Sequence, residues 1–208
     1  MNQCHEANRS HWNADAQRWK ELKDEMGNWH LCHSDPSIMF DDVHLRAFGD
    51  LNGKRACVFA SGDNRAVFAL TGLGATVTSV DISENQLEVA RQRASELDPD
   101  VLFIRSDVTH IPELESNQFD LVFMGGVAIF WFSNLEAVCR EAARILLPGG
   151  RAAWLSGIII PSPLYGRRTS RDLKSSILIS TVAQGFSSTD SAQNTTCTIG
   201  QSAINSRP

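Results

Sequence analysis

The chain has 208 residues, of which 42% are hydrophobic and 21% are charged. This composition is typical of a globular protein with a buried core, and the length fits one α/β domain rather than two. The formal net charge of −5 argues against general electrostatic binding to nucleic acid or to an anionic membrane surface. We therefore expect neither nucleic acid nor a membrane among its partners.

The five cysteines are an odd number, are scattered along the chain and form no Cys-x-x-Cys pair. This pattern argues against a disulfide framework or a four-cysteine zinc site, so we expect no metal and a reducing compartment. The segment Met1–Trp12 is polar and lacks the hydrophobic stretch of a signal peptide. The longest apolar run, Leu121–Phe132, is shorter than the roughly 20 residues that span a bilayer. These features predict a cytoplasmic protein.

Three zones of the chain differ in composition, and they predict three parts. Residues 1–50 are polar and rich in tryptophan, and we expect them to form an N-terminal helical cap. Residues 51–156 alternate short apolar runs with amphipathic stretches and predict the main domain. Residues 157–208 are rich in Ser and Thr and poor in charge, which predicts a divergent or disordered tail.

The N-terminal zone predicts one helix, from about Ser10 to Met26. A set of apolar residues recurs there at helical spacing, with charged residues elsewhere around the cylinder. The pattern is typical of a helix docked on a domain, or of a lid over a pocket. The residues of this stripe are Trp12, Ala16, Trp19, Leu22 and Met26.

The main domain predicts strands that alternate with helices. Ser83 with Gln86, and Ser133 with Glu136, have the spacing of capping boxes and mark two helix starts. Strands that are apolar throughout and alternate with helices predict a doubly wound, mostly parallel α/β sheet with helices on both faces. The predicted strands are Ala56–Ser61, Thr76–Val80, Val101–Ile104, Phe119–Met124 and Arg151–Leu155. The predicted helices are about 64–71, 83–97 and 133–146.

Glycines and acids follow the predicted strands at the points where they end. In doubly wound sheets, ligands bind beyond the carboxyl ends of the strands, so these residues are expected to line one crevice. The carboxylate of Asp81 can accept two hydrogen bonds from a ribose diol. The side chain of Asp107, with the Val108 amide, can bind the edge of an adenine ring. The residues at these ends are the turn 61–64, Asp81, Asp107, and Gly125 with Gly126.

Two kinds of nucleotide-type ligand fit such a crevice. A dinucleotide requires the turn G-x-G-x-x-G, whose third glycine lets helix and strand pack closely around the pyrophosphate site. In this chain those three positions are Ala60, Gly62 and Arg65. S-adenosylmethionine carries no phosphate and needs a turn with fewer glycines, so the residues favour it over a dinucleotide.

Residues from about 53 to 156 resemble a class I S-adenosylmethionine-dependent methyltransferase of the methyltransferase type 11 sort. Two positions differ from the first motif of that family: Val58 stands where an acid is usual, and Ala60 replaces the first glycine. The family normally closes its sheet with a further helix and an antiparallel strand pair. In this chain only one candidate strand for that pair is found, at Ile177–Val182. The segments that carry the resemblance are 54–64, Val77–Ser83, Arg105–Val108, Phe119–Met124 and Leu146–Arg151.

The resemblance implies a Rossmann-like domain that binds S-adenosyl-L-methionine and transfers its methyl group to a small-molecule acceptor. No (Asp/Asn)-Pro-Pro-(Tyr/Phe) motif follows the fourth strand, which disfavours amino groups of DNA bases and glutamine amides as acceptors. The run Ile129–Phe132 fits either an apolar substrate pocket or core packing, and no catalytic residue is identified. The cofactor-binding residues that it implies are Ala60, Ser61, Gly62, Asp81, Ile82, Asp107, Val108 and Gly125.

Two other functions remain open at this point. Val58, Ala60 and the unusual C-terminal zone are also compatible with a catalytically silent or incomplete methyltransferase-like domain that only binds the cofactor. An NAD-dependent oxidoreductase is the third alternative, and the large side chain of Arg65 disfavours it.

Overall fold

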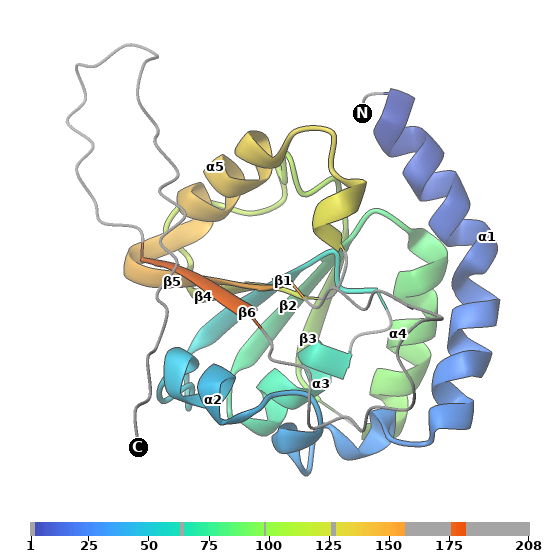
Figure 1. Cartoon of the computed structure of the whole chain (residues 1–208), viewed down its shortest axis with the longest axis horizontal. Coiled ribbons are helices and arrows are strands. Elements are labelled where there is room, and N and C mark those ends of the chain that lie inside the picture. Colours follow the sequence, from blue (N-terminus) through green and yellow to red (C-terminus); the bar gives the residue numbers. More distant parts are fainter. Residues whose placement is uncertain (1–2, 63–64, 98, 126–127, 157–175, 182–208) are drawn as a thin grey trace, which may run out of the picture.

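The computed structural model describes residues 3–62, 65–97, 99–125, 128–156 and 176–181. Its centre is a six-stranded sheet with the strand order β3-β2-β1-β4-β5-β6 (Figure 1). Strands β1 to β5 pair in parallel, and β6 pairs antiparallel to β5. The predicted fold class is therefore confirmed. The strands are β1 (Arg55–Phe59), β2 (Thr76–Asp81), β3 (Val101–Arg105), β4 (Phe119–Met124), β5 (Leu146–Ser156) and β6 (Ser176–Thr181).

Helices cover both faces of this sheet, as its doubly wound connections require. Helix α1 is the longest described helix and lies along α4 (Figure 1). The helices are α1 (Gln3–Met26), α2 (Asp42–Phe48), α3 (Arg65–Gly72), α4 (Glu84–Leu97) and α5 (Leu135–Ile145). Three short 3₁₀ helices are η1 (Trp29–Leu31), η2 (Pro36–Ile38) and η3 (Ala128–Trp131).

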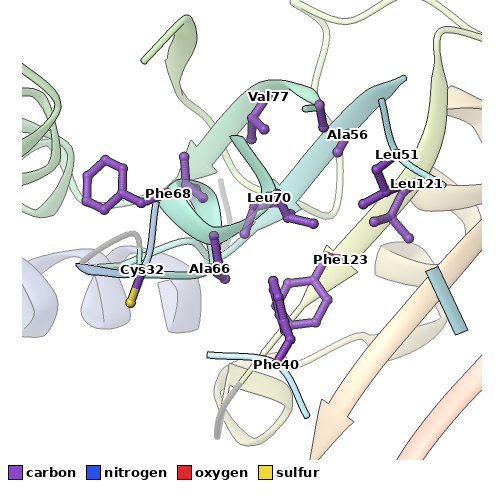
Figure 2. Packing of buried hydrophobic residues seen from close by; sticks show 14 of the residues in the cluster. Cys32, Phe40, Leu51, Ala56, Ala66, Phe68, Leu70, Val77, Leu121 and Phe123 are labelled. Atoms are coloured by element: carbon purple, nitrogen blue, oxygen red, sulfur yellow. The ribbon is translucent and has the colours of Figure 1, made fainter. Parts of the chain in front are cut away.

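The central strands are buried on both faces, because successive side chains of a strand point to opposite sides of the sheet. In β4, Leu121 and Phe123 join a cluster with Phe40 and with the apolar face of α3, which Figure 2 shows. Val122 and Met124 of the same strand join a second cluster with the apolar face of α5. This double burial explains why the central strands read as continuous apolar runs in the sequence.

Helix α1 is longer than predicted, because it begins at Gln3 rather than near Ser10. Its predicted stripe is also only partly buried: Ala16 is buried, whereas Leu22 and Met26 are exposed. The end of the helix, where Leu22 and Met26 are exposed, is attached by polar and charged contacts. The side chain of Arg93, which is 1% exposed, donates to Asp24 Oδ1 at 2.7 Å and to the Lys20 carbonyl at 3.2 Å.

One of the two predicted helix caps is confirmed, and the other is wrong by one residue. Ser83 caps α4, since its Oγ accepts a hydrogen bond from Gln86 N at 3.1 Å. Helix α5 is capped by Asn134, whose side chain accepts from Ala137 N at 3.0 Å. Ser133 is not the cap because its hydroxyl binds His5 Nε2 of α1 instead, at 2.8 Å.

Strand β5 begins five residues before the predicted start at Arg151 and contains an irregularity. Leu146 pairs with Phe119, but the next pair joins Arg151 to Leu121, so β5 bulges between these two pairs. Gly149 lies in the bulge with φ = 79°, a left-handed conformation that favours glycine. The Pro148-Gly149-Gly150 sequence therefore makes a bulge within a strand rather than a turn before it.

The C-terminal zone contributes one strand to the sheet, close to the candidate at 177–182. Strand β6 pairs with β5 from Ser176↔Ser156 to Thr181↔Arg151. The expectation of a divergent or disordered tail otherwise concerns residues 157–175 and 182–208, which lie outside the described residues. None of the helices in the described ranges is both long enough and apolar enough to cross a membrane.

Candidate functional site

A cavity of about 320 Å³ lies where the carboxyl ends of β1 to β4 face helix α1. All eight residues predicted to bind the cofactor line it, which brings together four segments that are distant in the sequence. The convergence follows from the parallel sheet, whose strands end at one edge. Ala60, Ser61 and Gly62 follow β1, Asp81 ends β2 and Ile82 follows it, Asp107 and Val108 follow β3, and Gly125 follows β4.

The turn after β1 presents its backbone to the cavity. Ala60 (φ = 47°) and Gly62 (φ = 52°) are both left-handed, a conformation that glycine adopts easily and alanine does not. Apart from its chain neighbours, no described residue has an atom within 4 Å of the position that a Cβ on Gly62 would take, so this position faces open space. Ser61 is fixed to the neighbouring strand: its N–H donates to the Val80 carbonyl at 3.1 Å, and its Oγ accepts from Ser79 Oγ at 2.9 Å.

Asp81 is buried at the end of β2, with 6% of its surface exposed. Its Oδ2 accepts a hydrogen bond from Gly62 N, and its Oδ1 accepts one from Ser83 N, each at 2.8 Å. Burial raises the pKa of Asp81, and these backbone N–H groups oppose the rise because they stabilise the carboxylate. An ionised carboxylate has about four lone-pair positions, so each oxygen can accept a further hydrogen bond from a ligand.

Asp107 is held by protein partners that the sequence did not reveal. Its Oδ2 binds His5 Nδ1 at 2.6 Å, and its Oδ1 accepts from Thr109 N and Thr109 Oγ1 at 3.0 and 2.8 Å. Burial favours the neutral acid, but the Thr109 donors and His5 outweigh it and lower the pKa of Asp107. Because Nε2 of His5 binds Ser133, the imidazole links α1, the end of β3 and the start of α5.

One face of helix α1 forms the wall opposite the strand ends. The side chains on this face follow one another at intervals of three, four or seven residues, which is the spacing of a single helix face. Asn8 Nδ2 donates to the Trp131 carbonyl at 2.6 Å, and the rings of Trp12 and Trp131 meet edge to face with centroids 5.0 Å apart. Helix α1 therefore docks on α4 and also forms one wall of the cavity. Its lining residues are His5, Asn8, Trp12, Trp19 and Lys23.

The run Ile129–Phe132 after β4 was predicted either to line a substrate pocket or to pack in the core, and its residues divide between these two roles. Trp131 and Phe132 line the cavity, and Ile129 packs against the core beneath α5. Phe130 is 69% exposed and does neither. Within the described ranges, no group of three or more His, Cys, Asp and Glu side chains is arranged to hold a metal ion.

The sequence did not reveal several residues of the wall. His5, Asn8 and Lys23 are polar, so they do not belong to the apolar stripe that predicts the helix; His5 and Asn8 lie in its first turns and Lys23 in its last. Extending the positions of Trp12 and Trp19 by whole helical turns in both directions leads to these residues. Arg65 was considered only as an obstacle to a dinucleotide, whereas its side chain lines the cavity.

The segment of the chain that contains most of this site matches a known protein family. Residues 58–154 match the family model described as "Methyltransferase domain". The segment spans the strand ends that line the cavity, from Val58 in β1 to Trp154 in β5. The predicted resemblance to a class I S-adenosylmethionine-dependent methyltransferase is therefore confirmed for this part of the chain.

Curated relatives are methyltransferases of longer sequence. A demethylmenaquinone methyltransferase from Clavibacter sepedonicus is 33% identical over 125 residues, which cover 59% of this chain and 49% of the relative. A 27-O-demethylrifamycin SV methyltransferase from Amycolatopsis mediterranei (strain S699) is 35% identical over 100 residues, covering 47% of this chain and 36% of the relative. The chain thus spans about half the length of these relatives, or less.

Solved structures share the fold at low sequence identity. An S-adenosyl-L-methionine-dependent methyltransferase from Methanococcus maripaludis matches with a TM-score of 0.55 and 19% identity, covering 70% of this chain and 64% of that structure. A SAM-dependent methyltransferase from Aquifex aeolicus matches with a TM-score of 0.51 and 23% identity, covering 59% and 68%. At these identities the likeness concerns the fold.

Proposed function

Because residues 58–154 match the methyltransferase domain family, we propose that this chain binds S-adenosyl-L-methionine and transfers its methyl group to a small-molecule acceptor. The observation that carries the proposal is the buried carboxylate of Asp81 at the end of β2, facing the open turn at Gly62. A buried acid with acceptor positions left over calls for a ligand with hydroxyl donors, which a ribose diol supplies.

The other predicted residues fit the remaining parts of this cofactor. Ile82 and Val108 present apolar side chains to the cavity, which suits the two faces of an adenine ring. Asp107 can accept a hydrogen bond from the adenine amino group, since its two oxygens have more lone pairs than its present partners use. The backbone at Gly62 and Gly125 lines the cavity, and we propose that the amino-acid moiety lies beside it. Together with Asp81, and with Ala60 and Ser61 of the turn after β1, these five residues make up the eight proposed contacts, and we propose no metal.

The chain's own residues would act by binding, orientation and exclusion of water. The bound cofactor supplies an activated methyl group on a sulfonium, so a protein needs to provide proximity and alignment. Trp12, Trp131 and Phe132 line the cavity with large apolar surfaces that exclude water. We propose no catalytic residue for the transfer itself.

The identity of the relatives supports a small-molecule acceptor. The relative from Clavibacter sepedonicus is a demethylmenaquinone methyltransferase, and the one from Amycolatopsis mediterranei acts on 27-O-demethylrifamycin SV. Because the chain covers about half of these proteins or less, we propose the reaction class and not either substrate. A cytoplasmic location, with no nucleic-acid or membrane partner, belongs to the same proposal and follows from the charge and the scattered cysteines.

A binding titration and a turnover assay test this function. Calorimetry with S-adenosylmethionine, S-adenosylhomocysteine and NAD should show binding of the first two and weaker or no binding of NAD. Production of S-adenosylhomocysteine with a panel of small-molecule acceptors then separates an active enzyme from a silent cofactor-binding domain. Tighter binding of NAD than of S-adenosylmethionine would contradict the proposal.

A further inference from the structure

Among the described residues, the cavity wall contains two cationic side chains, Lys23 of α1 and Arg65 at the start of α3. The Lys23 ammonium lies 5.6 Å from the centroid of the Trp19 ring, a cation–π distance. The Nε of Arg65 is buried and has no hydrogen-bond partner among the described residues. Neither side chain forms an ion pair with any residue that the structure describes, although both acids of the cavity do have protein partners. These two positive charges are therefore available to a ligand.

The proton acceptors of the cavity are already engaged. Among the lining residues that the structure describes, the titratable candidates for a general base are His5, Asp81 and Asp107. His5 is bound on both ring nitrogens, and the acceptor positions that Asp81 and Asp107 have left are those proposed above for the ribose and adenine of the cofactor. A general base has to reach the proton that it removes, and with the cofactor bound none of the described lining residues is left to serve the acceptor. The acceptor must therefore arrive ionised or become ionised through its surroundings.

The balance of charge points in the same direction. Among the lining residues that the structure describes, Lys23 and Arg65 balance the charges of Asp81 and Asp107. S-adenosylmethionine brings an ammonium, a sulfonium and one carboxylate, so its binding adds one net positive charge. Its single carboxylate cannot neutralise both cations. A negatively charged second ligand would offset the positive charge that the cofactor adds. Nearby cations also favour the ionised form of an acid.

We infer that the methyl acceptor of this chain is an organic anion with an apolar body: a carboxylate, or an acidic hydroxyl bound as its oxyanion. The inference rests on the proposed function and specifies its substrate class. The anionic group binds beside Lys23 and Arg65, and the apolar body packs against Trp19, Met39 and Phe123, which line the same cavity. An oxygen lone pair forms the new bond to the methyl carbon as the sulfur–carbon bond breaks, and that electron pair stays on sulfur. One negative and one positive charge cancel, and no proton moves.

Two matched probes test this substrate class. 2-Naphthoate and 2-naphthamide have nearly the same shape and differ in charge. Calorimetry on the protein saturated with S-adenosylhomocysteine should show that naphthoate binds at least about tenfold more tightly, as charge-assisted hydrogen bonds imply. Arg65→Gln and Lys23→Met should each reduce this preference to about threefold or less. Arg18→Gln is the control, because Arg18 is an exposed cation of the same helix outside the cavity, and it should leave the preference unchanged.

Equal binding of the two probes to the parent protein would overturn the inference. It would also be overturned if Arg65→Gln left the naphthoate preference intact but weakened binding of S-adenosylhomocysteine relative to 5′-methylthioadenosine, which lacks the amino-acid moiety. The cations would then serve the carboxylate of the cofactor. If the parent failed to bind S-adenosylhomocysteine at all, the proposed function would fail by itself. The naphthoate preference, measured on the free protein, would still decide for or against the anion site.

Discussion

His5 in the first turns of α1 and Asp107 after β3 are 102 residues apart in the sequence, yet their side chains meet at 2.6 Å. His5 is 4% exposed, so this pair joins the covering helix to the sheet away from solvent. The second ring nitrogen binds Ser133, which places the start of α5 in the same network. The end of the cavity beside Asp107 is therefore held by one imidazole and not only by the sheet.

Replacing His5 should loosen the N-terminal helix. His5→Ala leaves the buried side of Asp107 with one partner fewer, and we expect the free energy of unfolding in urea to fall by about 1–3 kcal/mol. Ser133→Ala removes only the hydrogen bond between Ser133 and His5 Nε2, and it should lower the free energy of unfolding by about 0.5–1.5 kcal/mol. Arg18→Ala serves as the control, since Arg18 is an exposed residue of the same helix. A His5→Ala variant as stable as the parent would show that the network contributes nothing to folding.

Asp81→Asn should weaken cofactor binding without preventing folding. The amide keeps one oxygen acceptor for the N–H of Gly62 or of Ser83, whereas Asp81→Ala removes the acceptor of both hydrogen bonds and destabilises the fold. Loss of charge-assisted bonds to the ribose hydroxyls should lower the affinity for S-adenosylhomocysteine at least about tenfold. Calorimetry measures the affinity, and thermal melting checks the fold. Unchanged affinity in a folded variant would make Asp81 a structural residue only.

The affinity for S-adenosylhomocysteine should depend on pH through Asp81. Burial raises the pKa of this carboxyl in the free protein, so it holds its proton to a higher pH than an exposed Asp does. Ribose hydroxyls donate to the ionised form, and the ligand therefore binds more weakly as the pH falls through the raised pKa. In that range binding should release a proton, which calorimetry in buffers of different ionisation enthalpy can count. Asp81→Asn should abolish the release; if the variant releases the same number of protons, another group is responsible.

Ala60→Gly should stabilise the protein slightly. A left-handed backbone costs a residue with a Cβ about 1–2 kcal/mol, and glycine costs about 0.4–1 kcal/mol through its freedom in the unfolded chain. The net expectation is a gain of about 0.5–1 kcal/mol in the free energy of unfolding. Gly62→Ala is the matched opposite change, and it should lower the free energy of unfolding by about 1 kcal/mol because Gly62 is also left-handed. The open space around Gly62 means that no steric clash adds to this loss. A loss of stability in Ala60→Gly would mean that the alanine methyl group packs favourably.

The sheet and its site could be predicted from the sequence because they depend on short-range patterns. Apolar runs that end in Gly or Asp identify the strands, and a parallel sheet brings those ends together whatever the details of packing. This is why all eight predicted residues line one cavity. The N-terminal helix was harder, since polar residues such as His5 become informative only once Asp107 is placed opposite. Ser133 and Asn134 are equally good helix caps in sequence, and the hydrogen bond from Ser133 to His5 decides between them.

The central place of β1 has a consequence for the order in which the fold assembles. Ala56 pairs with Val77 on one side and with Leu121 on the other, so the first pairing closes a short loop and the second a much longer one. Because the entropy of closing a loop grows with its length, the β1–β2 pair is expected to form before β4 docks. The turn at Gly62 then exists early, but Gly125 reaches it only with the later pairing. A ligand that needs both sides of the cavity would bind only chains that have completed this step, and its binding during refolding would time the docking of β4.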